Sequence, residues 1–320
     1  MKILPKHQSK NVRFLYFMRG IFLYLMGGPK DKAPLERRWA SMSQDERAYV
    51  ERRVSYYCRG EQTFVVGEGG TSIGDFSRTI FGGQSNYFFD TYEYVRYFPK
   101  ECRFNKRFGD EWFVPDEPTF VKARPIQGDV ANSVLLKLNK VRHFNFLHDK
   151  VPFEKKKDQL VWRGAAKHRN RMLLLENYFH HPQFDVGRTN DPQGDGLWKK
   201  PFMSIRDQLK CKFILSIEGN DVATNLKWIM SSGSICFMPK PTRETWFMEG
   251  TLVAGEHYVE VKDDFSDVEE KVKYYSENTD HALRIIRNAN HYIEQFKDAE
   301  REALIAYRVV EKYFALSGQL

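Results

Sequence analysis

Residues 210–237 constrain this chain more than any other stretch, because they read as a strand, a tight turn, a helix and a second strand in direct succession. Apolar residues within 213–217 predict a buried strand, and Glu218-Gly219-Asn220-Asp221 predicts the turn that ends it. Such a unit leaves backbone N–H groups at the helix start, just beyond the carboxyl end of the strand, where α/β proteins hold phosphate groups. The sequence therefore indicates a nucleotide or sugar-nucleotide site.

Strand and helix patterns alternate regularly only after residue 150. The predicted strands are residues 160–163, 213–218, 234–238 and 257–261, and the predicted helices between them are residues 170–179, 222–231 and 244–250. This alternation is typical of an α/β protein with a doubly wound parallel sheet. Two or three amphipathic helices follow to the end of the sequence.

The length of the chain favours two domains. A chain of 320 residues is long for one hydrophobic core, since single cores stop growing at roughly 250–300 residues. We expect a first domain over residues 1–150 and a second over 151–320, closed by the C-terminal helices. The first part is irregular. Ser43 and Glu46 have capping-box spacing, and residues 67–70 form a glycine-rich segment without the Lys-Ser/Thr ending of a P-loop.

Charge and cysteine content narrow the possible partners and compartment. The formal net charge of +8 implies attraction to anions, but the 50 basic residues are spread along the chain among 42 acidic ones, which disfavours a nucleic-acid-binding face. The four cysteines lack the spacing of a zinc site or a disulfide framework. A reducing, cytoplasmic environment fits this pattern.

Residues 12–26 form the longest apolar segment near the N-terminus. The segment follows a basic start, yet it contains Arg13 and Arg19 and precedes Gly27-Gly28-Pro29 without a small-residue cleavage site. It is also too short and too charged to span a bilayer, which takes about 20 apolar residues. Two interpretations remain: a core helix of the first domain, or a helix lying at a membrane surface with basic residues against anionic lipid.

A first cluster of candidate ligands follows the strand predicted at 160–163. Gly164 lets a ligand approach the backbone closely, while the guanidinium groups of Arg163 and Arg171 suit bidentate phosphate contacts. A solvated position in the first turn of the next helix explains Arg171 equally well. A charge that ends an apolar strand needs a partner, so Arg163 is the stronger candidate.

A second cluster surrounds the turn at Gly219. Asn220 or Asp221 is expected to cap the following helix, in which Asn225 could reach a sugar or base and Lys227 a phosphate. A solvated Lys227 fits the spacing equally well, so the spacing alone leaves its role open.

Longer blocks of sequence resemble a known family. The succession PTFVKARPI (118–126), NSVLLKLNKVRHF (132–144), LVWRGAAKHRNR (160–171), IRDQLKCKFILSIEGNDVATNLKWIMSSGSICF (205–237) and ETWFMEGTLVAGEHYVEVKDDFSDVEE (244–270) is similar to glycosyltransferase family 90. That family includes eukaryotic CAP10-like protein O-glucosyltransferases and a bacterial branch of LpsA-type lipopolysaccharide core glycosyltransferases. The similarity runs over roughly residues 80–300.

The resemblance implies a GT-B fold, with two Rossmann-like domains facing a cleft and a UDP-sugar donor on the C-terminal one. It implies inverting transfer without a bound metal, and it places Arg163, Gly164, Lys212, Gly219 and the helix from Val222 around the donor. Where eukaryotic members have an arginine in this helix, the chain has Asn225, so Arg171 or Lys227 would have to supply the second diphosphate contact.

The residues agree with metal independence, since no D-x-D motif ends an apolar strand and no other cofactor is indicated. Cationic side chains and a helix start would then stabilise the departing diphosphate. Inverting transfer also needs a general base. Asp110, in the turn before PTFVKARPI, resembles the catalytic aspartate of the family, with Asp90, Glu111 and Asp116 as competitors.

Three further residues complete the predicted site. Lys122 and Arg124 could contact an anionic acceptor or the diphosphate, or could be ordinary charges at a strand edge. Glu249 is suited to accept hydrogen bonds from ribose or sugar hydroxyls.

The expected function is that of a cytoplasmic enzyme peripheral to the inner membrane. It would move glucose or galactose from a UDP-sugar to a lipopolysaccharide inner-core sugar, whose polyanionic character suits a basic protein. A capsular or protein O-glycosyltransferase is the alternative within the class. A non-catalytic carbohydrate-binding or nucleic-acid-binding protein is the alternative outside it.

Overall fold

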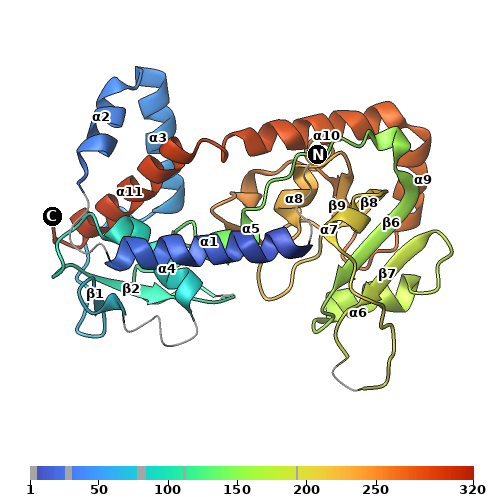
Figure 1. The fold of residues 1–320 in the computed structure, drawn as a ribbon, viewed down its shortest axis with the longest axis horizontal. Coiled ribbons are helices and arrows are strands. Elements are labelled where there is room, and N and C mark those ends of the chain that lie inside the picture. The colour runs from blue at the N-terminus through green and yellow to red at the C-terminus, as the bar shows by residue number, and fades with distance from the viewer. Residues whose placement is uncertain (1–5, 26–30, 78–83, 111–112, 192–193) are drawn as a thin grey trace. The chain divides into compact units, whose positions relative to one another are not determined.

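The computed structural model describes residues 6–25, 31–77, 84–110, 113–191 and 194–320, which form two compact units (Figure 1). Unit 1 consists mainly of His143–Pro241 and Glu249–Gln295. Unit 2 consists of Lys10–Arg142, Thr242–Met248 and Phe296–Leu320. The main boundary between the units therefore lies between residues 142 and 143, whereas the sequence predicted a boundary at residue 150. The last helix groups with unit 2, not with the second half of the chain.

Unit 1 contains a parallel five-stranded sheet in the order β11-β9-β8-β6-β7. The strands are β6 (Lys157–Gly164), β7 (Phe184–Arg188), β8 (Cys211–Leu215), β9 (Ile235–Met238) and β11 (Val259–Glu260). The helices are α6 (Arg169–Tyr178), α7 (Ile205–Gln208), α8 (Leu226–Met230), α9 (Val268–Glu277) and α10 (Thr279–Glu294), with 3-10 turns η2 (Phe153–Lys155) and η3 (Glu249–Thr251). The prediction of a parallel α/β sheet is confirmed.

Alternation of buried apolar side chains explains why these strands form the core of unit 1. Leu160 and Trp162 of β6, Phe213 and Leu215 of β8, and Phe237 of β9 belong to one buried cluster with residues of α6, α9 and α10. Burying such side chains stabilises a fold by about 1.5–3 kcal/mol each. The sheet is thus held as a rigid support for the loops that follow its strands.

Two sequence predictions in this region differ from the structure. Residues 184–188 form β7, which was not predicted, because an Asp and a Gly interrupt the apolar pattern of FDVGR. Residues 244–250 were predicted as a helix but contain β10 (Arg243–Thr245) and the start of η3. That helical prediction was wrong because Thr242–Met248 belongs to unit 2, where Glu244 and Thr245 pair with β4 (Ala123–Pro125), a segment distant in sequence.

Unit 2 has a second, smaller sheet in the order β1-β2-β3-β5. Its strands are β1 (Thr71–Ser72), β2 (Arg103–Arg107), β3 (Thr119–Val121) and β5 (Ser133–Leu135), of which β2, β3 and β5 are parallel. Its helices are α1 (Lys6–Leu25), of which the part from Lys10 onward belongs to unit 2, α2 (Ala33–Ser41), α3 (Gln44–Tyr57), α4 (Ser85–Val95) and α11 (Ala299–Leu316). The short α5 (Lys140–His143) lies where the two units join in sequence. The predicted capping box of Ser43 and Glu46 starts α3.

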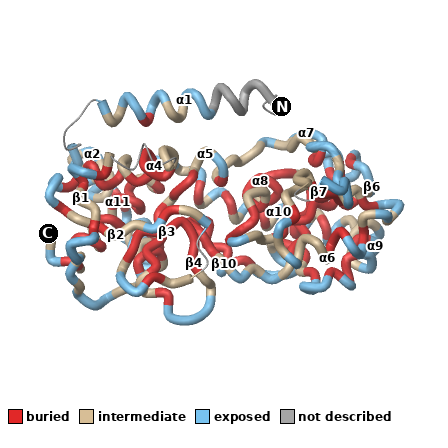
Figure 2. Tube along the Cα trace, turned by 90° about the horizontal axis from the view of Figure 1, so that it is seen from below, coloured by how far each residue is buried: buried red, intermediate tan, exposed pale blue. Residues whose placement is uncertain are grey.

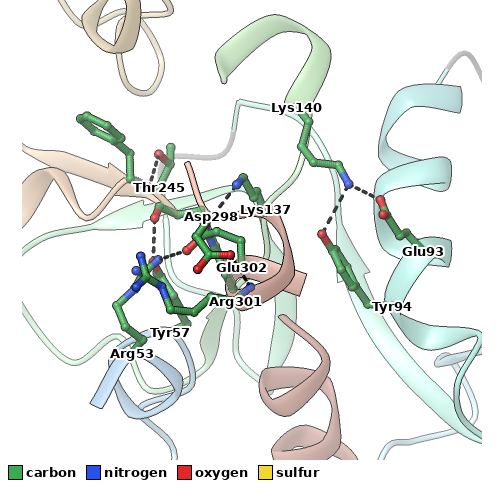
Figure 3. Close-up of polar contacts among 12 residues, drawn as sticks. Arg53, Tyr57, Glu93, Tyr94, Lys137, Lys140, Thr245, Asp298, Arg301 and Glu302 are labelled. Carbon is green, nitrogen blue, oxygen red and sulfur yellow. Dashed lines mark hydrogen bonds and ion pairs between the residues drawn. The ribbon is translucent and has the colours of Figure 1, made fainter. Parts of the chain in front are cut away.

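A buried carboxylate in α11 joins distant segments of unit 2 (Figure 3). Glu302 accepts hydrogen bonds from Arg53 of α3 at 2.9 Å, from Lys137 after β5 at 3.0 Å and from the Trp246 indole N–H at 2.6 Å. Burial lowers the pKa of Lys137, and the Glu302 carboxylate opposes that shift. Because an unpaired buried charge is costly, these contacts fix the last helix on unit 2.

Helix α1 packs against α4 in unit 2. Tyr16 donates to the Asp90 carboxylate at 2.7 Å, and the rings of Phe17 and Tyr24 lie edge-on to Phe89 and Phe88. Its opposite face is exposed, so α1 is not a fully buried core helix. Within the described ranges, no helix has the length and apolar character needed to cross a bilayer.

Candidate functional site

The strand order of unit 1 creates a topological switch point at the carboxyl edge of the sheet, and we use the word crevice for the region between the loops that follow β6 and β8. β7 lies on one side of β6 and β8 on the other, so the connections after β6 and β8 run in opposite directions. In open α/β sheets, ligands bind beyond the carboxyl ends of the strands at such a switch point. The loops that border it are residues 165–168, after β6, and residues 216–221, after β8.

Arg171 joins these two loops. From the first turn of α6, its Nη1 donates to the Ala165 carbonyl at 2.9 Å, while Nη2 donates to Ile217 at 2.7 Å and Nε to Glu218 at 3.1 Å. Asn170 also donates to the Glu218 carbonyl, at 3.1 Å. The guanidinium group therefore holds both walls of the crevice in place and contributes its positive charge there.

The two predicted glycines are explained by close packing. A Cβ added at Gly219 would lie 3.1 Å from Nη2 of Arg171, and one added at Gly164 would lie 2.8 Å from the Trp162 ring. Both distances are shorter than an ordinary van der Waals contact. Gly219 thus allows the second loop to approach the guanidinium group, while Gly164 accommodates a core tryptophan.

Lys167 and His168 add basic groups to the loop after β6. Lys167 is exposed and makes no ion pair with the residues that the structure describes. His168 is the N-cap residue of α6, and its pKa lies below the usual range because of burial and the charges of Arg171 and Lys167. An anion at this edge would meet Lys167, the Arg171 charge and the start of α6 together.

Two of the predicted donor contacts lie elsewhere in unit 1. Arg163 donates to Asp185 of β7 through its Nη2, at 2.6 Å from the carboxylate, and its side chain is largely buried. Lys212 pairs with Asp158 at 3.2 Å near the amino end of β8, the edge opposite to Gly219. Arg163 therefore joins β6 to β7. Lys212 lies at the edge of the sheet opposite to Gly219, so one ligand at the Gly219 edge would not contact both residues.

The segment before α8 also differs from the prediction. The helix starts at Leu226 with Asn225 as its N-cap residue and without a side-chain cap, so neither Asn220 nor Asp221 caps it. Asn220 is exposed beside the crevice, whereas Asp221 is buried. Asn225 donates to the Leu215 carbonyl at 2.8 Å and so fastens the helix start to the end of β8.

Lys227 and Glu249, both predicted as donor ligands, are each other's partner. Lys227 Nζ lies 2.5 Å from Glu249 Oε1, and both side chains are essentially inaccessible to solvent. This buried ion pair joins α8 to η3. In the structure each side chain is thus engaged by the other, and the predicted donor contacts of both residues stay predictions.

In unit 2, Asp110 and Lys122 come together at the carboxyl end of the parallel sheet. Asp110 follows β2 and Lys122 follows β3, and the two side chains form an ion pair. Lys122 is 2% exposed while Asp110 is 39% exposed. The buried lysine thus holds an accessible carboxylate, and Lys122 itself is too enclosed to bind an acceptor directly.

Arg124 is enclosed completely within unit 2. Its Nε donates to Glu244 at 2.8 Å and its Nη atoms donate to the carbonyls of Tyr56 and Ser133 at 2.6 and 3.1 Å. The predicted contact of Arg124 with an acceptor or diphosphate is therefore corrected: this guanidinium group fastens β10 to β4 and α3.

The competing carboxylates differ in accessibility. Asp90 is buried in α4, where it accepts hydrogen bonds from the Tyr16 hydroxyl and the Lys140 backbone, and burial raises its pKa. Asp116 is exposed and lines an open pocket with Lys106 and Arg107. Glu111 lies outside the described residues.

Comparisons with known proteins agree with the sequence resemblance. The model of glycosyl transferase family 90 matches residues 136–315. The chain is 44% identical over 287 residues to O-glucosyltransferase LpsA of Dichelobacter nodosus, covering 90% of this chain and 89% of that protein. It is 26% identical over 164 residues to protein O-glucosyltransferase 3 of Homo sapiens, covering 49% of this chain and 32% of the human protein.

The region matched by the family model covers the candidate residues of unit 1 but not those of unit 2. It contains the whole crevice of unit 1, from Gly164 to Asp221, whereas Asp110, Lys122 and Arg124 lie before its first residue. Sequence reasoning did not identify the carbonyls of Ala165, Ile217 and Glu218 as partners of Arg171. Backbone acceptors leave no side-chain signal by which they could have been found.

Proposed function

The chain belongs to glycosyl transferase family 90 and is a glycosyltransferase, and from this premise we propose that it transfers a hexose from a UDP-sugar to a lipopolysaccharide inner-core sugar. The observation that carries the proposal is the crevice between β6 and β8. Arg171 holds its two loops, Gly219 allows their close approach, and Lys167 offers an exposed ammonium group beside the start of α6. A nucleoside diphosphate is the ligand class that suits this edge.

In the proposed reaction, the acceptor hydroxyl oxygen attacks the anomeric carbon as the bond from that carbon to the β-phosphate oxygen breaks. The configuration inverts, and UDP leaves with the bonding electron pair. Lys167, the Arg171 charge and the first turn of α6 would stabilise the negative charge that develops on the diphosphate. We propose that these groups fill the role that a divalent cation has in other glycosyltransferases.

The acceptor proton requires a base, and we propose Asp110. Its support is the exposed carboxylate at the carboxyl end of β2, held by the buried ammonium group of Lys122. A GT-B architecture, with units 1 and 2 as its two Rossmann-like domains, is part of the same proposal. The parallel strands in each unit support it.

The two relatives favour glucose over galactose as the transferred sugar, because both are named O-glucosyltransferases. The net charge of +8 supports a polyanionic lipid-linked acceptor at the cytoplasmic face of a membrane. Capsular saccharide and protein acceptors are the alternatives that an acceptor panel must include.

The test is transfer from a panel of UDP-sugars to truncated core oligosaccharides, a capsular saccharide and a peptide, with EDTA or added Mn²⁺ in parallel. We expect product from UDP-glucose and a core oligosaccharide. Inversion of the α-linked donor would give a β-glycosidic bond in that product, and EDTA should not lower the rate of transfer. Product only on peptide or capsular saccharide would overturn the acceptor assignment. Loss of activity in EDTA that Mn²⁺ restores would overturn metal independence.

A further inference from the structure

Helix α1 presents a continuous apolar face to solvent. On the side away from α4, exposed apolar side chains occur at Phe14, Leu15, Met18, Ile21, Phe22 and Leu25. Their spacing of three, four and seven residues places them on one stripe of the helix. Figure 2 shows this part of α1 with exposed and intermediate positions along its length. We call these six residues the α1 outer face.

The inner face of the same helix is already used. Tyr16, Phe17 and Tyr24 contact α4, and a Cβ added at Gly20 would lie 2.6 Å from the Phe89 ring. Arg96 also donates to the Leu23 carbonyl at 2.9 Å. The helix is therefore fixed on unit 2 with its outer face directed to solvent. A helix of a monomeric soluble domain normally presents polar residues on that side.

The charge around this face identifies its partner. The first 30 residues contain Lys2, Lys6, Lys10, Arg13, Arg19 and Lys30, and the first acidic residue is Asp31. Because this stretch of sequence carries six basic residues and no acidic one, a second copy of it would be repelled. In the part of α1 whose side chains the structure describes, Arg13 is exposed, and Arg19 is exposed but lies 3.3 Å from the Glu93 carboxylate of α4. The basic stretch would be attracted to an anionic lipid surface, where basic side chains meet headgroups and aromatic side chains enter the boundary with the acyl chains.

We propose that the α1 outer face binds an anionic bilayer as an interfacial helix, with Phe14 and Phe22 inserted below the headgroups. The proposal deepens the proposed function, because it names the surface that would bring the enzyme to a lipid-linked acceptor. Binding to lipid requires no sugar substrate, so it can be tested separately from catalysis.

The experiment is sedimentation of the full-length protein with sucrose-loaded vesicles of phosphatidylcholine, with or without 30% phosphatidylglycerol. We expect binding only to the anionic vesicles. Phe14→Ser/Phe22→Ser should weaken it by at least about ten-fold, because two large apolar side chains are lost. Lys10→Gln/Arg13→Gln should weaken it by about five-fold for each charge removed. Phe202→Ser is the matched control, since Phe202 is 70% exposed but lies outside α1.

Several outcomes separate this proposal from its alternatives. Equal binding of the wild type and Phe14→Ser/Phe22→Ser would overturn it. A concentration-dependent dimer in lipid-free solution that the same double variant abolishes would assign the face to a second copy, and would also overturn it. Unchanged thermal unfolding of the variant, together with unchanged transfer to a water-soluble acceptor, shows that a loss of binding is not a loss of folding. If the wild type and the variants bind vesicles as predicted but the protein transfers sugar from no UDP-sugar, the proposed reaction is wrong and the proposed lipid-binding face is supported.

Discussion

The Arg171 guanidinium group lies directly against Gly219, so that a β-carbon at position 219 would lie 3.1 Å from Nη2. The same group donates hydrogen bonds to backbone carbonyls on both sides of the crevice. One side chain thus sets the distance between the two loops, and one glycine permits that distance. Ligand binding at the edge of the sheet is expected to depend on this pair even where neither residue touches the ligand.

Gly219→Ala is expected to lower kcat/KM for the donor by about ten-fold, because a Cβ 3.1 Å from Nη2 would displace the Arg171 guanidinium group by less than the misplacement of about 1 Å that can cost about 100-fold. Steady-state kinetics with varied donor measures it. Gly67→Ala is the matched control, since a Cβ at Gly67 meets no atom within 4 Å. Wild-type kinetics in Gly219→Ala would contradict the role assigned to the contact.

Lys167→Ala and Lys212→Ala should have opposite outcomes. Loss of the exposed Lys167 ammonium group removes a charged contact to the diphosphate, which is expected to raise donor KM by about ten-fold or more. Lys212 lies at the amino end of β8 with Asp158, so its removal should leave donor KM within about two-fold. Titration of UDP by calorimetry gives the same comparison without acceptor. A larger effect at Lys212 would place the donor at the other edge of the sheet.

The buried pair of Lys227 and Glu249 is expected to behave as a structural unit. Lys227→Met or Glu249→Gln alone should destabilise unit 1 by about 3–5 kcal/mol, because either change leaves one buried charge without its partner. The double variant Lys227→Met/Glu249→Gln should lose less than the sum of the two. Urea unfolding followed by tryptophan fluorescence measures the coupling. Additive losses would show that the two residues do not stabilise each other.

Asp110→Asn is expected to lower kcat by about 10²–10⁴-fold with little change in donor KM, because the amide cannot accept the acceptor proton. Asp116→Asn tests the exposed competing carboxylate and should keep its transfer activity if Asp110 is the base. Donor hydrolysis and glycosyl transfer should be followed separately. Full transfer activity in Asp110→Asn would remove Asp110 as the base.

Asp90 should make the stability of unit 2 depend on pH. Burial raises its folded-state pKa above the usual 3.8, so the protonated carboxyl group favours the folded state. That contribution is complete below pH 3.8 and is lost as the pH rises toward the folded-state pKa. Asp90→Asn should therefore flatten the fall in unfolding free energy across this range, as measured by urea unfolding at several pH values. An unchanged pH slope in the variant would show that Asp90 is not the group responsible.

Several features of unit 1 could be read from local sequence. Strands β6, β8 and β9 each contain a contiguous run of apolar residues, and such a run is a local signal of a buried strand. The parallel α/β arrangement follows from the alternation of these strands with helices. The position of Gly219 just after a buried strand was also predictable. In contrast, β7 was missed because Asp185 and Gly187 hide its apolar pattern.

The roles of the charged residues could not be read in the same way. Arg163 was a candidate ligand because it ends an apolar strand, and Lys227 because it lies early in the predicted helix. Arg124 was a candidate as a cation that could reach an anionic acceptor. In the structure these three are paired inside their own units with Asp185, Glu249 and Glu244 respectively. A buried cation is stable only beside an acceptor, and that acceptor belongs to a segment many residues away.

By itself the sequence determined the family of this protein, the α/β sheet with its glycine turn, and the basic, apolar N-terminal segment. These follow from local periodicity and from long ordered blocks of residues. Only the tertiary structure decided which cations remain at the crevice, which carboxylate stays accessible and which face of α1 meets solvent. Those properties depend on burial and on partners brought together through space, and neither is contained in the spacing of residues along the chain.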